Sequence, residues 1–504
     1  MQNQVQLITY VDRLSGGGLA ELDALLAGPL QDLFGGMHLL PFFDAIDGAD
    51  AGFDPIDHTR VDPRLGGWPD VRALASRMDV IADLIVNHIS RDSPQFRDFR
   101  NKGSASEYAG LFLTRDSVFG VNASAAEVRS VYRPRPGAPF IEVALGDGAC
   151  ETLWTTFTPN QIDIDVTHPQ GVAYLERILE TFAGSGVRVV RLDAVGYAVK
   201  KAGTSCFMIP ETFAFIDRLA RRAQSLGMEV LVEIHSHYRT QVEIAKRVAW
   251  VYDFALPPLI LHAFAFRTAK RLKEWLRIRP TNAVTVLDTH DGIGIVDVGD
   301  GGPHAPGLVP PDELERLVEV IHENSRGESR RATGASASNL DLYQLNCTYY
   351  DALARDDRNY ILARAIQFFT PGIPQVYYVG LLAGENDLDL LARTGVGRDI
   401  NRHYYGPDEI REALERPVVQ KLVELIRLRN THPAFGGCFF VEDSADDELV
   451  MQWRAGTEFA ELVIRFADER HRLVFSHEGG RRALDLPAPS ITLPASRTVE
   501  TPAC

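Results

Sequence analysis

The chain has 504 residues and a hydrophobic content of 45%, so it is long enough to bury a large core and to form more than one domain. Its formal net charge is −16, and this acidic balance argues against nucleic acid and anionic membranes as partners. The longest apolar region, residues 254–266, is too short to span a bilayer and contains Pro257 and Pro258. We therefore expect a globular protein with no membrane partner.

Cysteine usage indicates a reducing compartment. Five cysteines lie at positions 150, 206, 347, 438 and 504, an odd number with wide spacing and no Cys-x-x-Cys pattern. The first residues lack the basic region and the apolar core of a signal peptide. We expect reduced thiols in a cytoplasmic protein.

Short apolar runs alternate with helix-like segments, such as Pro69–Met78, along most of the chain. The runs predicted as strands are Gln6–Tyr10, Met37–Phe43, Val80–His88, Val187–Asp193, Met228–His235, Val251–Phe254, Ala283–Asp291 and Gly372–Tyr378. Eight such units are typical of an α/β protein with a (β/α)8 TIM barrel, which carries its chemistry at the carboxyl ends of its strands.

Two intervals are too long for ordinary connections and predict inserted subdomains after the third and seventh strands. Small residues in Ala332–Gln344, within the second interval, indicate a mobile loop. From about Phe435 short alternating segments predict a C-terminal antiparallel β domain. The expected order is barrel (residues 1–88), inserted domain over the active site (89–167), barrel (168–294), second insertion with the mobile loop (295–355), barrel (356–434) and β domain (435–504).

Residues suited to catalysis gather at the ends of three of these runs. Arg191 and Asp193 alternate along one strand and share a face, where the guanidinium keeps the carboxylate ionised. An ionised, oriented carboxylate suits a covalent nucleophile, although a structural ion pair is the alternative for this stretch alone. Glu233 and Asp291 stand at the ends of two further runs. Three carboxylates at buried strand ends indicate a catalytic site, because burying several charges is costly without a functional return.

The order of these residues resembles the four-motif signature of the α-amylase superfamily of retaining glycosidases, glycoside hydrolase family 13. The resemblance rests on Asp83–His88, Arg191–Asp193, Glu233 and His290–Asp291, in that order on the matching strands. It implies Asp193 as the nucleophile, Glu233 as the general acid/base and Asp291 as the stabiliser of the transition state.

Further segments are similar to the sucrose phosphorylase family within that superfamily. They are residues 47–58, 132–136, 202–208, 339–344 and 397–405. The resemblance covers about residues 1–435 closely, and it implies a homodimer that reversibly transfers glucosyl from sucrose to inorganic phosphate, giving α-D-glucose 1-phosphate and D-fructose. Alternatives are a phosphorylase for glucosylglycerol or sucrose 6-phosphate, a retaining sucrose hydrolase and, remotely, an inactive binding subunit.

The same resemblance assigns a glucose pocket, to which Arg191 also belongs. His88 and His290 are expected to donate hydrogen bonds to glucose hydroxyls, with satisfied core histidines as the alternative. Asp50 and Arg398 are expected to close the far end, which limits the substrate to a terminal glucose. Apolar walls are expected from Phe53, Phe157 and Tyr197, with ordinary core packing as the alternative for Phe157 and Tyr197.

The acceptor side must bind phosphate, an anion, next to several carboxylates. Arg135, with Tyr132 nearby, is the expected phosphate ligand because a guanidinium binds phosphate in a fork geometry; a solvated surface arginine is the alternative. Expected helpers are His235 and Tyr343 for phosphate, and Asp341 and Gln344 for fructose. We expect residues 132–137 and 335–344 to exchange positions between the two half-reactions.

This chemistry requires no cofactor, and we expect no metal. Asp163 and Asp165 alternate in a way that resembles a calcium site of some α-amylase relatives. We interpret the two aspartates instead as a solvated strand face.

Overall fold

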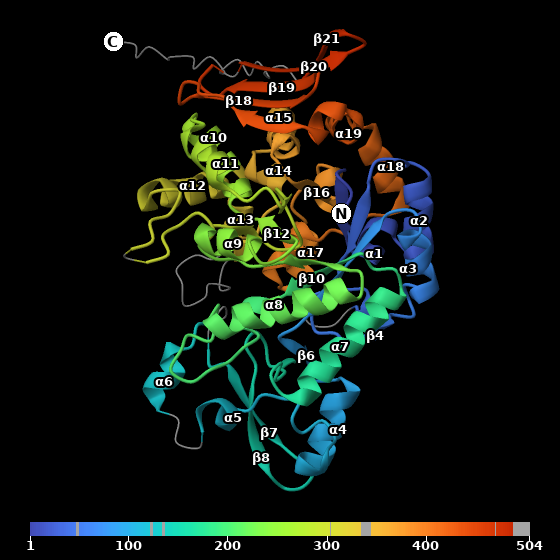
Figure 1. The fold of residues 1–504 in the computed structure, drawn as a ribbon, viewed down its shortest axis with the longest axis vertical. Helices are drawn as coiled ribbons and strands as arrows, with labels where there is room; N and C mark the ends of the chain where they lie inside the picture. Colours follow the sequence, from blue (N-terminus) through green and yellow to red (C-terminus); the bar gives the residue numbers. More distant parts are fainter. Residues whose placement is uncertain are drawn as a thin grey trace, which may run out of the picture.

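The computed structural model describes residues 1–46, 50–120, 124–133, 137–302, 304–333, 344–468 and 470–486. In these residues eight parallel strands close into a barrel in the order β1-β16-β13-β12-β11-β10-β5-β2 (Figure 1). The strands are β1 (Gln6–Thr9), β2 (Gly36–Leu39), β5 (Asp79–Ile85), β10 (Val189–Asp193), β11 (Glu229–Val232), β12 (Trp250–Asp253), β13 (Ala283–Thr285) and β16 (Ile373–Tyr377). Each overlaps one of the eight predicted runs, and β2, β5 and β12 begin one residue earlier than predicted, so the prediction of a (β/α)8 barrel is confirmed.

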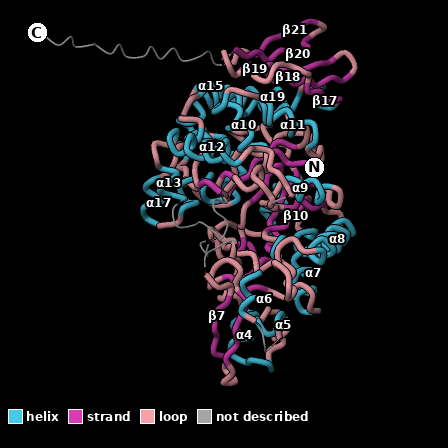
Figure 2. The backbone as a smooth tube through the Cα atoms, turned by 90° about the vertical axis from the view of Figure 1, so that its left-hand side faces the viewer, coloured by secondary structure: helices cyan, strands magenta, loops and turns pink. Residues whose placement is uncertain are grey.

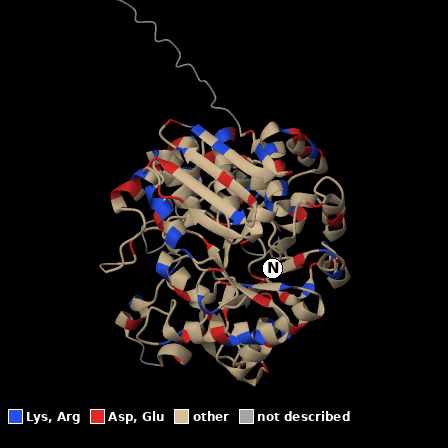
Figure 3. Ribbon diagram, turned by 45° about the horizontal axis from the view of Figure 1, so that its top comes forward, with Lys and Arg blue, Asp and Glu red and all other residues tan. Residues whose placement is uncertain are grey.

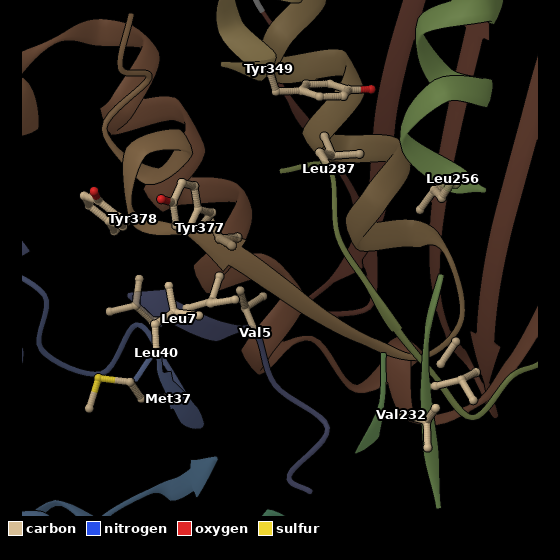
Figure 4. Close-up of a cluster of buried hydrophobic side chains, with 14 of the residues drawn as sticks. Val5, Leu7, Met37, Leu40, Val232, Leu256, Leu287, Tyr349, Tyr377 and Tyr378 are labelled. Atoms are coloured by element: carbon tan, nitrogen blue, oxygen red, sulfur yellow. The ribbon is translucent and has the colours of Figure 1, made fainter. Parts of the chain in front are cut away.

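Side chains of β10 alternate between two buried environments. Val190 and Leu192 belong to the large core between the strands and the surrounding helices, whereas Val189 belongs to a smaller cluster formed by residues on the barrel strands and directly after them. Arg191 and Asp193 therefore point to the same side as Val189, into the barrel. Figure 4 shows part of the large core, in which Leu7, Met37 and Val232 on strands pack with helix residues such as Leu256 and Tyr349.

Helices surround the barrel. Those that cover it are α2 (Leu19–Ala27), α3 (Trp68–Ala75), α7 (Pro169–Gly184), α8 (Pro210–Ser225), α9 (Tyr238–Ala245), α10 (Leu256–Phe266), α11 (Lys270–Ile278), α15 (Asp357–Phe369) and α19 (Pro417–Thr431). Shorter elements are α1 (Val11–Ser15), β3 (Phe43–Asp44), β4 (Asp57–Val61), α16 (Tyr378–Leu381), α17 (Leu388–Thr394) and α18 (Pro407–Glu415). The helix predicted at Pro69–Met78 is α3.

The first insertion separates β5 from α7 and forms the lower end of the molecule in Figures 1 and 2. It contains β6 (His88–Ser90), α4 (Pro94–Lys102), α5 (Arg115–Phe119), α6 (Ala125–Ser130), β7 (Phe140–Ala144), β8 (Cys150–Trp154) and β9 (Gln161–Asp163). The strand predicted at Val80–His88 divides in two, because β5 leaves the barrel at Ile85 and His88 begins β6, which pairs antiparallel with β9. His88 is thereby fixed between barrel and insertion.

The second insertion follows β13. Its described elements are β14 (Ile293–Gly294), α12 (Pro311–Asn324), α13 (Glu328–Thr333), β15 (Gln344–Leu345) and α14 (Tyr349–Ala352). β14 pairs antiparallel with β15, which places Gln344 beside Gly294 at the barrel mouth. Most of the predicted mobile loop, with Asp341 and Tyr343, lies outside the described residues, as does Arg135.

A C-terminal antiparallel sheet lies at the opposite end from the first insertion (Figures 1 and 2). Its strands, in spatial order, are β17 (Cys438–Val441), β18 (Glu448–Ala455), β19 (Glu458–Arg465), β20 (Arg470–His477) and β21 (Gly480–Leu484). Its inner face is anchored to the barrel, since Trp453 Nε1 donates to the carbonyl oxygen of Phe369 on α15 at 2.7 Å. The predicted β domain is confirmed.

Acidic and basic residues are interspersed along the ribbon in Figure 3. Across the part of the chain that the structure describes, no helix combines the length and the apolar character needed to cross a membrane. The cysteines of that part, Cys150, Cys206, Cys347 and Cys438, are free thiols.

Candidate active site

A pocket lies at the carboxyl ends of the barrel strands. Asp193 is the last residue of β10, Glu233 directly follows β11, and Asp291 lies beyond β13. The predicted site residues that line the pocket are Asp50, Phe53, His88, Phe157, Asp193, Tyr197, Glu233, His235, His290, Asp291, Gln344 and Arg398. Side chains from widely separated parts of the chain therefore converge on one cavity, at the face where barrel enzymes carry their chemistry.

The Arg191 guanidinium contacts two of the three carboxylates. Its Nη1 lies 3.2 Å from Asp193 Oδ1, and its Nη2 lies 3.3 Å from Glu233 Oε1. Nη1 also contacts Asp83, whose other oxygen lies 3.0 Å from His38 Nε2. The Arg191 side chain is 2% exposed, so its orientation is fixed by these acceptors. Asp83 and His38 had no predicted role, although Asp83 opens the motif at residues 83–88.

The environment of Asp193 acts on its protonation in two directions. Burial and the neighbouring Glu233 carboxyl raise the pKa of Asp193, while the Arg191 charge opposes this rise. The second carboxyl therefore favours the neutral form of Asp193, and the guanidinium favours its carboxylate form. Ala194, which follows Asp193, adopts a left-handed backbone with φ of 53°, a sharp bend at the strand end.

Asp291 has a strongly cationic environment. Its Oδ1 lies 3.0 Å from Arg398 Nη1 and 3.9 Å from Arg402 Nη2. Burial alone favours the neutral acid, but Arg398 and its neighbours lower the pKa of Asp291 well below the usual range. Asp50 accepts from both arginines, at 3.0 Å from Arg398 and 3.2 Å from Arg402. Sequence reasoning missed Arg402, although it lies within the segment at 397–405.

Two of the three histidines that line the pocket, His88 and His290, are neutral near pH 7. Burial lowers the pKa of His290 to about 3 and also lowers that of His88. The His290 ring stacks on Phe53, with centroids 4.6 Å apart and planes inclined by 9°. His88 Nε2 donates to the carbonyl oxygen of Phe53 at 2.8 Å, so a sugar hydroxyl would have to compete with the main chain for this donor.

Aromatic rings form the outer wall. Tyr197 contacts Phe157 edge to face, with centroids 5.1 Å apart, and Phe207 at 4.8 Å. Tyr132 stacks on Phe207 at 4.6 Å, which places it behind the lining rather than in it. Burial raises the pKa of Tyr132 to about 12, so its hydroxyl stays protonated. Phe207 had no predicted role.

The interpretation of Asp163 and Asp165 as a solvated strand face is wrong for Asp163. This carboxylate is fully buried and lies 2.8 Å from the ammonium of Lys200. Lys200 also donates to Asn87 Oδ1 at 2.8 Å and to the carbonyl oxygen of Tyr197. The ammonium thus joins the inserted β9, the end of β5 and the segment after β10. Asp165 is half-buried and accepts from the backbone of Thr167.

Within the described residues, Glu233, His235 and Asp291 offer potential metal-ligand atoms within 4.8 Å of one another. These atoms belong to the pocket itself. Glycosyl transfer by a pair of carboxylates needs no metal.

A closed barrel with three carboxylates in one pocket, a bridging arginine and an aromatic wall defines a carbohydrate-active enzyme of the glycosyl-transfer type. Residues 30–248 match the model of the alpha-amylase catalytic domain. The chain is 61% identical to a sucrose phosphorylase of Agrobacterium vitis, over 94% of this chain and 98% of that protein. It is 52% identical to a sucrose phosphorylase of Bifidobacterium adolescentis, over 92% of each chain.

A solved structure agrees with these similarities. The crystal structure of the sucrose 6F-phosphate phosphorylase from Thermoanaerobacter thermosaccharolyticum superposes with a TM-score of 0.88 and 39% identity, covering 96% of this chain and 98% of that one. The chain therefore belongs to the α-amylase family, in its group of sucrose phosphorylases and related phosphorylases.

Proposed function

We propose that the protein transfers the glucosyl unit of sucrose reversibly to inorganic phosphate, giving α-D-glucose 1-phosphate and D-fructose. The observation that supports this proposal most directly is that one guanidinium, that of Arg191, contacts both Asp193 and Glu233. The pocket around them is also lined by the ion pair of Asp50 and Arg398. The 61% and 52% identities to sucrose phosphorylases support sucrose as the donor.

The first half-reaction forms a covalent glucosyl-enzyme. Asp193 attacks the anomeric carbon while Glu233 donates its proton to the departing fructose oxygen. The positive charge of Arg191 favours the carboxylate form of Asp193. Asp291, ionised at all working pH values, stabilises the positive charge that develops on the sugar. Two displacements at one carbon retain its configuration.

The second half-reaction delivers phosphate to the same carbon. Glu233, now a carboxylate, accepts a proton from the attacking phosphate, and the bond to Asp193 breaks. Arg135, with Tyr132, Tyr343 and His235, would bind the anion, and Asp341 with Gln344 would bind fructose in the reverse direction. Gln344 accepts from Arg398 Nη2 at 3.2 Å, which links the acceptor loop to the closed end of the pocket. We also propose that residues 132–137 and residues 335–344 exchange positions between the two half-reactions.

Three other activities use the same carboxylates. A phosphorylase acting on sucrose 6-phosphate or glucosylglycerol would differ only on the acceptor side, and a sucrose hydrolase would use water in place of phosphate. The higher identity to sucrose phosphorylases, 61% against 39% for the sucrose 6F-phosphate enzyme, favours sucrose. An inactive binding subunit is disfavoured because the buried charges around Arg191 are retained.

The remaining parts of the proposal concern the protein as a whole. Free thiols agree with a cytoplasmic location, and small-molecule substrates need no nucleic acid or membrane partner. We also propose a homodimer and the division of the chain at residues 88, 167, 294, 355 and 434. Size-exclusion chromatography with light scattering measures the oligomeric state directly.

The activity is tested by incubating the protein with sucrose, with and without inorganic phosphate, and quantifying glucose 1-phosphate, glucose and fructose. Equal amounts of glucose 1-phosphate and fructose, formed only with phosphate, support the proposal. Fructose with free glucose, at a rate indifferent to phosphate, identifies a hydrolase. Turnover of sucrose 6-phosphate or glucosylglycerol in place of sucrose identifies the related phosphorylases.

A further inference from the structure

His235 lies beyond the carboxyl end of β11, two residues after Glu233, and is 6% exposed. Its ring stacks on Phe254 at the end of β12, with centroids 3.9 Å apart and planes inclined by 17°. It lines the pocket on the side where β14 and β15 pair. The stacking fixes the ring plane but leaves open which nitrogen faces the pocket.

A fully buried carboxylate, Asp297, determines that orientation. Its Oδ2 lies 2.8 Å from His235 Nδ1, and its Oδ1 accepts from the backbone N–H of Ser236 at 3.1 Å and from Gln241 Nε2 at 3.0 Å. These three donors hold the carboxylate in one position. Because Nδ1 is engaged with Asp297, Nε2 lies on the opposite side of the ring.

Gly294 shows that the close approach of the two side chains depends on the local backbone. A Cβ atom at this position would lie 2.0 Å from Asp297 Oδ2 and 2.9 Å from His235 Nδ1. Both distances are far below van der Waals contact. A glycine at the edge of β14 therefore leaves the space in which the carboxylate and the imidazole meet.

The charges around His235 favour the imidazolium. Asp297 faces one side of the ring, Glu233 lies two residues before it in the chain, Asp291 lies beyond β13, and Phe254 contributes no charge. The pocket cations Arg191 and Arg398 are already engaged with Glu233 and Asp291. Burial opposes protonation, but Asp297 and the other carboxylates outweigh it and raise the pKa of His235.

We propose that Asp297 is a positioning residue that fixes His235 with Nδ1–H on Asp297 and holds its positive charge, so that Nε2–H is presented to the acceptor oxyanion. This inference rests on the proposed phosphorolysis and deepens it. Phosphate enters a pocket with three carboxylates, so a desolvated cation on its acceptor side lowers the cost of binding. Fructose, a neutral acceptor, depends less on that charge.

The test is Asp297→Asn, which keeps the side-chain volume and an acceptor oxygen but removes the charge. Rates of glucose 1-phosphate formation are measured against phosphate concentration between about pH 5 and pH 8, the range in which histidine titrates. We expect kcat/KM for phosphate to fall about tenfold or more, the size of one lost hydrogen bond to a charged group. The decline of kcat/KM at high pH should begin at a lower pH than in the wild-type protein, because His235 loses its proton more readily without the Asp297 charge. Fructose release in the first half-reaction should fall less.

A matched control is Asp300→Asn, an exposed carboxylate three residues further along that contacts the backbone of Gly307. It should leave both the phosphate dependence and the pH profile unchanged. An Asp297→Asn enzyme with an unaltered phosphate dependence and pH profile overturns the proposal, as does an equal loss in both half-reactions.

A second readout does not depend on turnover. Nitrogen-15 NMR of the histidine rings, with His235→Gln used to identify the signal, should show both nitrogens of His235 protonated near pH 7 in the wild-type protein. A neutral ring, or one with no proton on Nδ1, overturns the proposal even if Asp297→Asn fails to fold. If the wild-type protein forms no glucose 1-phosphate, the proposed function fails while the spectrum still decides the role of Asp297.

Discussion

The Arg398 guanidinium lies 3.0 Å from the Asp50 carboxylate, although 348 residues separate the two in the chain. The same nitrogen, Nη1, lies 3.0 Å from Asp291. One cation therefore links Asp50, which lines the pocket, to the carboxylate that we propose as transition-state stabiliser. Arg402, which is fully buried, contacts Asp50 from the other side at 3.2 Å.

Replacing Arg398 with alanine should lower kcat/KM for sucrose by about 10- to 100-fold, the range expected for losing charge-assisted hydrogen bonds. Asp50 and Asp291 would then share only Arg402 as a nearby cation, so the pKa of Asp291 would rise. Steady-state kinetics with sucrose measures the loss. The control is Arg393→Ala on the exposed face of α17, which should be neutral; a loss of similar size in both variants would contradict the assignment.

Glu233→Gln should reduce sucrose turnover by about 10²- to 10⁴-fold, because the departing fructose oxygen then receives no proton. α-Glucosyl fluoride has a leaving group that needs no protonation, so glucosyl-enzyme formation from this donor should fall much less. Asp193→Asn should abolish reaction with both donors. Fluoride release and fructose release, measured on both variants, separate the two roles. If Glu233→Gln slows the reaction with both donors equally, Glu233 is not the general acid.

Arg135→Ala should damage the phosphate-dependent step more than glucosyl-enzyme formation, since its guanidinium is the proposed ligand of the anion. Single-turnover fructose release and steady-state glucose 1-phosphate formation report the two steps separately. Arg129→Ala, on an exposed turn of α6, serves as the control. Equal loss in both steps would show that Arg135 has no special role toward phosphate.

Lys200→Met should lower the free energy of unfolding by about 3 to 5 kcal/mol, because it leaves Asp163 buried without its cation. The side chains of this pair are 2% and 0% exposed. The adjacent Lys201 is 57% exposed in its pair with Glu211, so Lys201→Met should change stability by less than about 0.5 kcal/mol. Urea unfolding measures both. Similar effects from the two neighbours would mean that the buried ammonium does not hold the insertion to the barrel.

Acid should destabilise the protein partly through His58. Burial lowers the pKa of this ring from its ordinary value of 6.5 to about 3, and His58 Nδ1 lies 3.0 Å from the hydroxyl of Tyr174. Between about pH 6.5 and pH 3 the unfolded chain binds a proton that the folded protein excludes, so stability falls as the pH falls, by up to about 1.4 kcal/mol per pH unit.

Urea unfolding at several pH values between these limits measures the slope of stability against pH. His58→Gln should make that slope shallower, whereas His304→Gln, at an exposed position, should leave it unchanged. A slope that His58→Gln does not alter would assign the acid sensitivity to other groups.

The sequence by itself determined the architecture and the chemical groups. Apolar runs of strand length and period, such as that of β10, follow from local preferences and from burial on both faces, so they can be recognised without tertiary information. The alternation of Arg191 and Asp193 likewise places both side chains on one face of a strand, because this follows from strand geometry alone. The three carboxylates could be identified because each stands at or near the end of such a run.

Only the tertiary structure decided which groups those side chains meet. Asp83 below Arg191, Arg402 beside Asp50, Lys200 against Asp163 and Asp297 against His235 all join segments that are distant in sequence or separated by turns. No local period encodes such pairs, because each depends on how the closed barrel and its insertions bring separate chain segments together. These contacts determine the electrostatic environment of Asp193, Asp291 and His235, which the sequence alone could not show.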